Sequence, residues 1–453
     1  MGRSRADRPN VVVFFTDQQR WDTTGLHDNP LDLTPNLDRH ARRGTHLVNF
    51  FTNQPVCGPS RACLQTGRYA TATGCFRNDI PLPGERRTLA HHFRAAGYAT
   101  AYIGKWHLAD PRTHGPVAQE QRGGYEYWLA ANVLEFTSEA YRTTLYDGSG
   151  DPVELPGYRV DALCDAAIRY IAGHRDEPFY LFLSLLEPHH QNPTGDYPAP
   201  EGYRERYAGR WMPPDLAALG GSAAQHIAGY FGMVKRLDEA FGRLMDALRS
   251  LAVEQDTIVL FTSDHGCHFH TRNREYKRSP HDASIRVPAV LLGPAFDRGT
   301  RVRELVSTVD LAPTLLDAAG LTVPADLDGR SVLPLLGGGA EWPGEVFIQV
   351  SEDHVGRAVR THRWKYAVVA PGAHGWRDAG SGHYREEFLY DLRADPYELT
   401  NLAGLASHQG VAEVMRGRLI HRMAAAGETE PVIEPAAARP GGQRTVTPEE
   451  TLE

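Results

Sequence analysis

Four apolar runs, each ending abruptly in polar residues, constrain the fold of this chain more than any other feature. Their residues are mostly aliphatic or aromatic, without the alternation of apolar and polar residues that a half-exposed strand shows. Near-continuous runs of this kind are typical of parallel strands covered on both faces. They predict a largely buried parallel sheet, with strands at residues 11–16, 98–104, 179–186 and 257–262.

Helical patterns separate these runs. Residues 34–43 have Pro35 just inside the expected start and Gly44 just past the end, which is the usual placement of proline and glycine at helix ends. Strand alternating with helix indicates a doubly wound α/β sheet, in which ligands bind outside the carboxyl ends of the strands. The polar residues that follow the apolar runs lie at those ends. Further helices are expected at residues 86–96, 160–174, 225–251 and 310–319.

The pattern changes at the glycine-rich residues 336–339. Short strand-like runs follow without a long helix between them, which predicts a small antiparallel sheet, and a helix is expected at 408–424. We therefore expect a large α/β domain over residues 1–340 and a smaller α+β subdomain, with the antiparallel sheet, over 341–426. Residues 427–453 are rich in Pro, Glu and Gly and are predicted to form a flexible tail.

Charge and cysteine content narrow the class of protein. The chain carries 48 Lys and Arg against 56 Asp and Glu, a net charge of −8, so it lacks the basic excess on which nucleic-acid binders depend. No window of about 18 apolar residues exists that could span a membrane. The first apolar run is short and lacks a signal-peptide cleavage pattern, and five cysteines indicate no disulfide framework. These features predict a cytoplasmic protein that binds neither nucleic acid nor membrane.

Residues 57–68 form the most distinctive segment, Cys-Gly-Pro-Ser-Arg-Ala-Cys-Leu-Gln-Thr-Gly-Arg. Considered alone, they read as a loop entering a helix, with Pro59 in the first turn, Gly67 past the end and Cys57 an ordinary buried thiol. The segment also resembles the signature of the sulfatase family, Cys-x-Pro-Ser-Arg followed by Thr-Gly-Arg. The resemblance extends along the whole chain, through Gly104-Lys105-Trp106-His107, Ser263-Asp264-His265-Gly266 and Leu389-Tyr390-Asp391-Leu392.

This resemblance implies both a fold and a chemistry. Sulfatases belong to the alkaline phosphatase superfamily, whose large mixed, mostly parallel sheet lies between helices, in agreement with the α/β pattern above. In the family, a separate formylglycine-generating enzyme oxidises the signature cysteine, here Cys57, to the aldehyde formylglycine, and the hydrate of this aldehyde is the nucleophile. A helix N-terminus at position 57 would also favour negative charge developing there.

Four residues that follow two of the apolar runs resemble the cation site of the family. Asp17 and Gln18 follow the first run, and Asp264 and His265 follow the last. Each could instead be a loop or capping residue, but as a set joined to Cys57 they imply one divalent cation. Oxygen ligands favour Ca²⁺, whereas the imidazole of His265 keeps Mn²⁺ open as the alternative.

Further residues match the family positions that grip the anion. Positive charge there would stabilise the oxygens of a sulfuryl or phosphoryl group in the transition state, and His107 would orient the nucleophile and help remove its proton. The candidate catalytic residues are Cys57, Arg61, Lys105, His107, His189 and Lys277. The substrate rim is less well matched, and its candidates are His190, Gln191, Asn192, His281 and Arg360.

The sequence therefore predicts an enzyme that hydrolyses organic sulfate monoesters, either of a small molecule or of a saccharide. The first alternative is a phosphonate monoester or phosphodiester hydrolase, because such an enzyme would use the same nucleophile and similar residues to bind the anionic group. The second is a sulfatase-like protein that binds without catalysis, and the presence of Cys57, Arg61 and Lys105 argues against it. The oligomeric state and the organic group of the substrate stay open.

Overall fold

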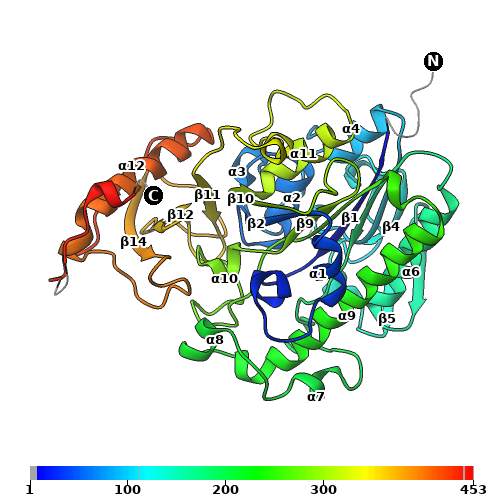
Figure 1. The fold of residues 1–453 in the computed structure, drawn as a ribbon, viewed down its shortest axis with the longest axis horizontal. Coiled ribbons are helices and arrows are strands. Elements are labelled where there is room, and N and C mark those ends of the chain that lie inside the picture. The colour runs from blue at the N-terminus through cyan, green and yellow to red at the C-terminus, as the bar shows by residue number, and fades with distance from the viewer. Residues whose placement is uncertain (1–7, 111, 442–443, 452–453) are drawn as a thin grey trace.

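A computed structural model describes residues 8–110, 112–441 and 444–451 of the chain. Within them, ten strands form one sheet (Figure 1). In sheet order the strands are β10 (Thr300–Ser307), β2 (Thr45–Phe51), β9 (Ala289–Leu292), β8 (Thr257–Ser263), β1 (Asn10–Thr16), β7 (Phe179–Ser184), β3 (Ala99–Lys105), β4 (Tyr127–Ala131), β5 (Arg142–Tyr146) and β6 (Pro152–Pro156). The neighbouring strands β8, β1, β7, β3 and β4 are parallel, whereas β9 and β5 run antiparallel to their neighbours. The predicted mixed, mostly parallel sheet is confirmed.

Helices cover both faces of this sheet. They include α1 (Pro35–Ala41), α2 (Cys57–Thr66), α4 (Leu89–Ala95), α6 (Arg159–Gly173), α9 (Ala223–Ser250) and α11 (Leu311–Ala318). The apolar runs form strands because each side chain has a core to enter: Val11 and Val13 of β1 pack with α2, α4 and α11, and Val12 and Phe14 pack with α1, α6 and α9 (Figure 1). None of the helices in the described residues combines the length and apolarity needed to cross a membrane.

Five shorter helices lie in the connections of the large sheet. They are α3 (Ala70–Thr73), α5 (Leu134–Thr137), α7 (Tyr203–Tyr207), α8 (Pro214–Ala218) and α10 (Asp282–Ile285). Of these, α5 matters most below, because it follows β4 and carries its residues to the carboxyl ends of the central strands.

A second sheet follows, in the order β11 (Glu345–Val350), β12 (Gly356–Thr361), β13 (Trp364–Val369), β14 (His383–Asp391) and β15 (Val432–Glu434). The first four strands are antiparallel, as predicted, and α12 (Gln409–Ala425) packs against them (Figure 1). Val346 and Ile348 of β11 share a core with Phe51 and Leu305 of the large sheet, so the two sheets are in direct contact. The division of the chain at residue 340 stays a prediction.

The segment expected to be a flexible tail is structured where it is described. Residues of β15 pair in parallel with β14, and Ile433 and Val446 are buried in the core under α12. The indole of Trp364 donates a hydrogen bond to the carbonyl of Glu450 at 3.0 Å. The high Pro, Glu and Gly content predicts flexibility, but an average over the segment does not reveal single buried residues. Ile433 and Val446 are two such residues, and they fix the segment to the second sheet.

Candidate active site

The candidate site lies at the carboxyl ends of the central strands. Asp17 follows β1, Lys105 ends β3, and Asp264 and His265 follow β8. Because these strands are parallel and close neighbours, their ends meet at one edge of the sheet.

The first turn of α2 also points at this edge. Cys57 is the first residue of that helix and is buried. The helix begins there because Val56 is extended and Pro59 fits the first turn, and it ends at Gly67, whose φ of 66° belongs to the left-handed region.

The side chains of Asp17, Cys57, Asp264 and His265 form a group whose potential ligand atoms all lie within 4.8 Å of one another. His265 Nε2 is 3.2 Å from Cys57 Sγ, 3.7 Å from Asp17 Oδ1 and 3.5 Å from Asp264 Oδ1. Burial and the neighbouring charge of Asp17 raise the pKa of Asp264. Two buried carboxylates and an imidazole facing one point are a donor set that fits a divalent cation.

Gln18, the remaining predicted ligand, lies beside this group. Its backbone has a φ of 69°, and its backbone N–H donates to Asp264 Oδ1 at 2.9 Å. Its amide oxygen accepts a hydrogen bond from Lys277 at 3.4 Å, while the amide nitrogen donates to the Tyr197 hydroxyl at 3.3 Å. The amide oxygen therefore faces the same space as the other four side chains.

Three buried cations surround Cys57 and the two carboxylates. Lys277 Nζ is 2.9 Å from Cys57 Sγ. Lys105 Nζ contacts Asp17 Oδ2 at 2.8 Å, and Arg61 contacts both Asp17 and Asp264, at 2.9 and 3.2 Å. Burial alone would raise the pKa of the Cys57 thiol, but Lys105 and Lys277 hold it well below the usual value. The site thus favours a negatively charged group at position 57.

The two predicted catalytic histidines complete the surroundings of Cys57. His107 has a φ of 59° and helps to lower the pKa of the Cys57 thiol, and its Nδ1 is 3.8 Å from Glu135. His189 Nε2 is 3.3 Å from Lys277 Nζ, and its Nδ1 contacts the carbonyl of His190 at 2.7 Å. All six predicted catalytic side chains are therefore brought together, and two of them, Arg61 and Lys105, face carboxylates rather than open space.

A cavity of about 770 Å³ gives access to Cys57. We call it the Cys57 cavity; its walls include Cys57, Asn78, Asp79, His107, Arg112, His114, Val133, Glu135, Phe136, His189, His190, Asn192, Glu275, Tyr276, Lys277, Arg278 and Trp376. Of the five predicted rim residues, His190 and Asn192 line this cavity. His190 stacks between the rings of His189 and Tyr276, with centroids 4.2 and 4.1 Å away.

The other three predicted rim residues do not line the Cys57 cavity. The Gln191 amide donates to the carbonyls of Glu135 and Ser138, both at 2.8 Å, so it braces a loop. His281 is buried between the Ser279 and Tyr390 hydroxyls, and Arg360 pairs with Asp282 over the ring of Phe51. Both His281 and Arg360 lie where the two sheets meet. At these positions the second sheet packs against α10 and β2 and does not cover the Cys57 cavity.

Three residues outside the predicted catalytic, metal and rim sets support the site. Glu135 of α5 pairs with Lys105 at 2.9 Å, and Asn78 Oδ1 accepts the backbone N–H of Gly58 at 2.9 Å. Glu352, in the turn between β11 and β12, accepts the backbone N–H of Asn78 at 2.7 Å and pairs with Arg278. Glu135 and Glu352 each follow a short apolar run, β4 and β11 respectively, whereas nothing local in the sequence marks Asn78.

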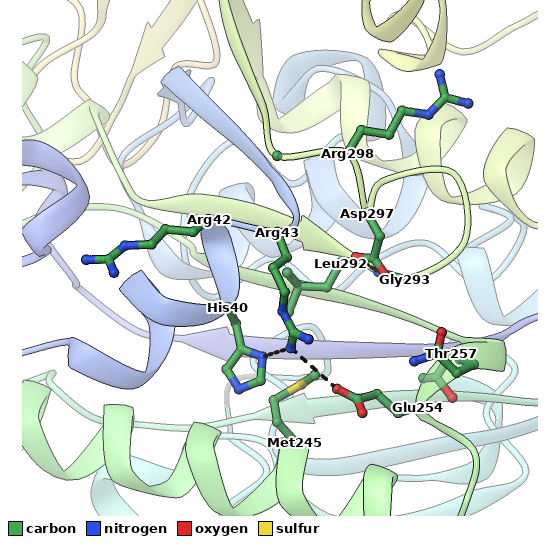
Figure 2. Close-up of a pocket in the computed structure, with 12 residues that line it drawn as sticks. His40, Arg42, Arg43, Met245, Glu254, Thr257, Leu292, Gly293, Asp297 and Arg298 are labelled. Atoms are coloured by element: carbon green, nitrogen blue, oxygen red, sulfur yellow. Dashed lines mark hydrogen bonds and ion pairs between the residues drawn. The ribbon is translucent and has the colours of Figure 1, made fainter.

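A different cavity, of about 480 Å³, lies at the opposite ends of the strands, near Thr257 where β8 begins. Figure 2 shows Arg43 between His40 and Glu254, at 3.5 and 3.8 Å, while Arg42 and Arg298 extend away from it. Within the described part of the chain, the group at Cys57 is the only set of three or more potential metal ligands. The Cys57 cavity is therefore the candidate active site.

Comparison with known proteins agrees with this assignment. Residues 9–321 match the family model "Sulfatase", and residues 275–425 match the model "N-sulphoglucosamine sulphohydrolase, C-terminal". The chain is 30% identical over 439 residues to the ulvan-active sulfatase of Formosa agariphila, covering 93% of this chain and 82% of that protein.

Solved structures share the fold. BT33494S-sulf, from work on glycosaminoglycan metabolism by Bacteroides thetaiotaomicron, has a TM-score of 0.81 at 23% identity, covering 93% of this chain and 97% of that one. The phosphonate monoester hydrolase SpPMH of Silicibacter pomeroyi has a TM-score of 0.68 at 21% identity, covering 92% and 96%. With a family model over most of the large sheet and a relative aligned along nearly the whole chain, the chain belongs to the sulfatase family of hydrolases, within the alkaline phosphatase superfamily.

Proposed function

We propose that this enzyme hydrolyses a sulfate monoester, using formylglycine derived from Cys57 and one divalent cation. The observation that carries the proposal is the position of Cys57, buried at the start of α2 between the Asp17, Asp264 and His265 side chains and the ammonium group of Lys277. A nucleophile there meets a cation site on one side and fixed positive charge on the other. The formylglycine hydrate would supply the attacking hydroxyl.

The cation would be held by Asp17, Gln18, Asp264 and His265, together with residue 57. When bound, it would help to ionise the attacking hydroxyl and neutralise charge on the ester oxygens. Two carboxylates and an amide oxygen favour Ca²⁺, and His265 leaves Mn²⁺ as the alternative. Arg61 and Lys105 hold the Asp17 carboxylate in place, because they contact it at 2.9 and 2.8 Å.

The remaining residues would act on the ester. Lys277 contacts both Cys57 and His189, and His107 helps to lower the pKa of the Cys57 thiol, so a sulfate bound there would meet donors from all three residues. Donors fixed in a buried site stabilise the charge that develops on the sulfuryl oxygens without having to reorganise. His107 is placed to orient the nucleophile and to accept its proton.

A saccharide sulfate is the substrate class that we propose. The ulvan-active sulfatase of Formosa agariphila and the N-acetylglucosamine-6-O-sulfatase of Bacteroides thetaiotaomicron are both relatives along most of the chain, at 30% and 24% identity. The Cys57 cavity, at about 770 Å³, has room for a sugar beyond the sulfate. Maturation would require a formylglycine-generating enzyme as a partner.

Intact mass and one substitution test the proposal together. Conversion of the thiol to the aldehyde lowers the mass by ~18 Da, a difference given by simple atom arithmetic on the thiol. We expect this shift in protein from a host with the maturation enzyme, together with release of sulfate from 4-nitrophenyl sulfate. Cys57→Ala should lower turnover by about 1000-fold or more. Cys63→Ala, which removes a buried thiol nearly two turns further along α2, should leave turnover near the parent value.

The same assay separates the two alternatives. An unshifted mass together with no turnover would favour a binding protein without catalysis. A preference of several orders of magnitude for an aryl phosphonate monoester over the aryl sulfate would favour the phosphonate monoester hydrolase, whose fold this chain shares.

A further inference from the structure

A second cavity adjoins the Cys57 cavity. It has a volume of about 590 Å³ and is lined by Phe136, Thr137, Ser138, Glu139, Ala140, Tyr141, Arg142, Thr144, Gln191, Pro193, Thr194, Asp196 and Pro198. We call it the Tyr141 cavity. Phe136 lines both cavities, so the two meet at its ring. Nothing in the proposed reaction uses the Tyr141 cavity.

Two chain segments run through both cavities. The segment after β4 places Val133 and Glu135 in the Cys57 cavity and Tyr141 in the Tyr141 cavity. The segment after β7 does the same, because Asn192 lines the first cavity and Gln191 the second. The same two loops therefore line both cavities, which we together call the groove, and the first of these cavities reaches Cys57.

Aromatic rings are exposed along this groove. Phe136 is 52% exposed, Tyr141 is 55% exposed, and Trp376, which also lines the Cys57 cavity, is 39% exposed. Arg77 lies 5.7 Å from the centroid of the Trp376 ring, which fixes its orientation. Exposed aromatic rings inside a groove mark a surface that a ligand covers.

The chemistry of the Tyr141 cavity fits a sugar ring. A pyranose ring has an apolar face of C–H groups, which packs on an aromatic ring, and a rim of hydroxyl groups, which donate to carboxylates. Glu139 and Asp196 provide carboxylates in the same wall as Tyr141, and Asp196 is also paired with Arg204 at 2.6 Å. Arg142, the basic residue in the wall, already faces Glu154 at 3.6 Å. The cavity therefore suits an uncharged ring better than a second sulfate group.

We propose that the Tyr141 cavity is a saccharide subsite, which holds the sugar next to the sulfated one. The substrate is then an oligosaccharide or polymer. Its length matters for binding because neighbouring sugars occupy the two cavities on either side of Phe136. This inference rests on the proposed function, because it takes the sulfated sugar to lie in the Cys57 cavity.

Inhibition by sugars of defined length tests the subsite. The probes are ulvan fractions of one, two and four sugars, and chondroitin sulfate fractions of two and four sugars. Each is measured as an inhibitor of 4-nitrophenyl sulfate turnover and as a quencher of tryptophan fluorescence, since Trp376 lines the groove. We expect the longest fraction of at least one series to bind about tenfold more tightly than the shortest.

Two variants assign the length preference to this cavity. Tyr141→Ala should bring the ratio between long and short fractions close to one. Tyr127→Ala should keep the ratio of the parent enzyme, because Tyr127 is also exposed, at 40%, but packs on Tyr170 and lines neither cavity. A general structural defect would change the binding constants of the long and the short fractions alike and would leave the ratio between them unaltered.

The outcomes separate this inference from the proposed function. Equal binding of short and long fractions, no binding of any fraction, or a ratio that survives Tyr141→Ala would each overturn the subsite. Loss of all aryl sulfate turnover would instead count against the proposed function, and fluorescence would still report on the subsite.

Discussion

At the scale of single residues, the site is a set of buried charges that neutralise one another. Lys105 is fully buried and lies between two carboxylates, 2.8 Å from Asp17 and 2.9 Å from Glu135. Burial tends to raise the pKa of Glu135, but Lys105 and His107 hold it below the usual value. Glu135 is therefore ionised and fixes the direction of the Lys105 ammonium group.

Removing the charge of Glu135 should weaken catalysis. A hydrogen bond to a charged group contributes about 1.5–3 kcal/mol, which corresponds to roughly a 10- to 100-fold change in rate. We expect Glu135→Gln to lower kcat for 4-nitrophenyl sulfate by this factor, because Lys105 loses one of its two anchors. Glu154→Gln removes an exposed carboxylate and serves as the control. A kcat for Glu135→Gln equal to that of the control would show that Asp17 alone positions Lys105.

Much of the site could be predicted at this scale, because a long motif carries it. Cys57 and Lys105 match family motifs, Lys277 matches by its spacing to Arg286 alone, and the three converge as expected. Glu135 and Asn78 could not be found this way, because their roles depend on which loops the fold brings together. Gln191 shows the converse: its place after a core strand suggested a ligand, yet its amide satisfies two loop carbonyls.

At the scale of elements, α9 supplies the N-terminal cap of α1. The Asp238 carboxylate accepts the backbone N–H groups of Asn36 and Leu37, at 3.1 and 2.8 Å, across more than 200 residues of sequence. Thr34, the residue before this helix, makes no such cap with its side chain. The sequence pattern located the helix but not its cap, because a capping residue from another element leaves no local signal.

Asp238 should make stability depend on pH. Burial raises the pKa of Asp238 to about 6. The hydrogen bonds from the backbone N–H groups of Leu37 and Asn36 lower this pKa, but their effect is smaller than that of burial. An unfolded Asp titrates near 4, so the folded protein binds a proton between about pH 4 and 6 that the unfolded chain does not. The resulting stabilisation is complete below pH 4 and is lost as the pH rises through 6, amounting to about 2–3 kcal/mol.

Urea unfolding at pH 4.5 and pH 7 measures this contribution. The loss of unfolding free energy between the two pH values should be smaller in Asp238→Asn than in the parent enzyme. Asp246→Asn, which changes an exposed carboxylate on the same helix, should keep the parent dependence. Identical pH dependence in all three proteins would mean that Asp238 titrates at its unfolded value.

The turn between β11 and β12 links the second sheet to the Cys57 cavity. Glu352 in this turn has a φ of 70°, and its carboxylate reaches both the Asn78 backbone and the Arg278 guanidinium. Asn78 in turn holds the N–H of Gly58, next to Cys57. We expect Glu352→Gln to raise KM for 4-nitrophenyl sulfate by about tenfold, because Arg278 lines the cavity and loses its charged partner.

Glu352→Ala should in addition lower kcat, because the Asn78 contact is lost as well. Asp353→Asn provides the matched control, because the Asp353 carboxylate lies next in the chain and pairs with His354. Equal KM values for Glu352→Gln and Asp353→Asn would show that Arg278 is positioned by Glu275 instead.

At the scale of the whole molecule, the two-sheet architecture could be predicted because it depends on burial patterns. Continuous apolar runs indicated strands covered on both faces, and the short runs after residue 340 indicated an antiparallel sheet. The contact between the sheets could not be predicted. It is made by residues such as His281 and Arg360, whose polar side chains suggested the substrate rim but are buried between the two sheets.

The proposed cation site joins distant parts of the large sheet, so ion binding should stabilise the whole fold. Asp17, Cys57 and His265 come from the end of β1, the start of α2 and the end of β8. An ion that binds the folded state alone adds about 2.7 kcal/mol at a concentration 100 times its Kd. Treatment with a chelator should therefore lower Tm by several degrees, and Ca²⁺ should restore it, with Mn²⁺ compared in parallel. Asp264→Asn should abolish this response, whereas Asp326→Asn, at an exposed carboxylate, should keep it. An unchanged Tm after chelation, with no metal detected by elemental analysis before it, would remove the cation from the proposed function, because the two buried carboxylates would then be balanced by Arg61 and Lys105 alone.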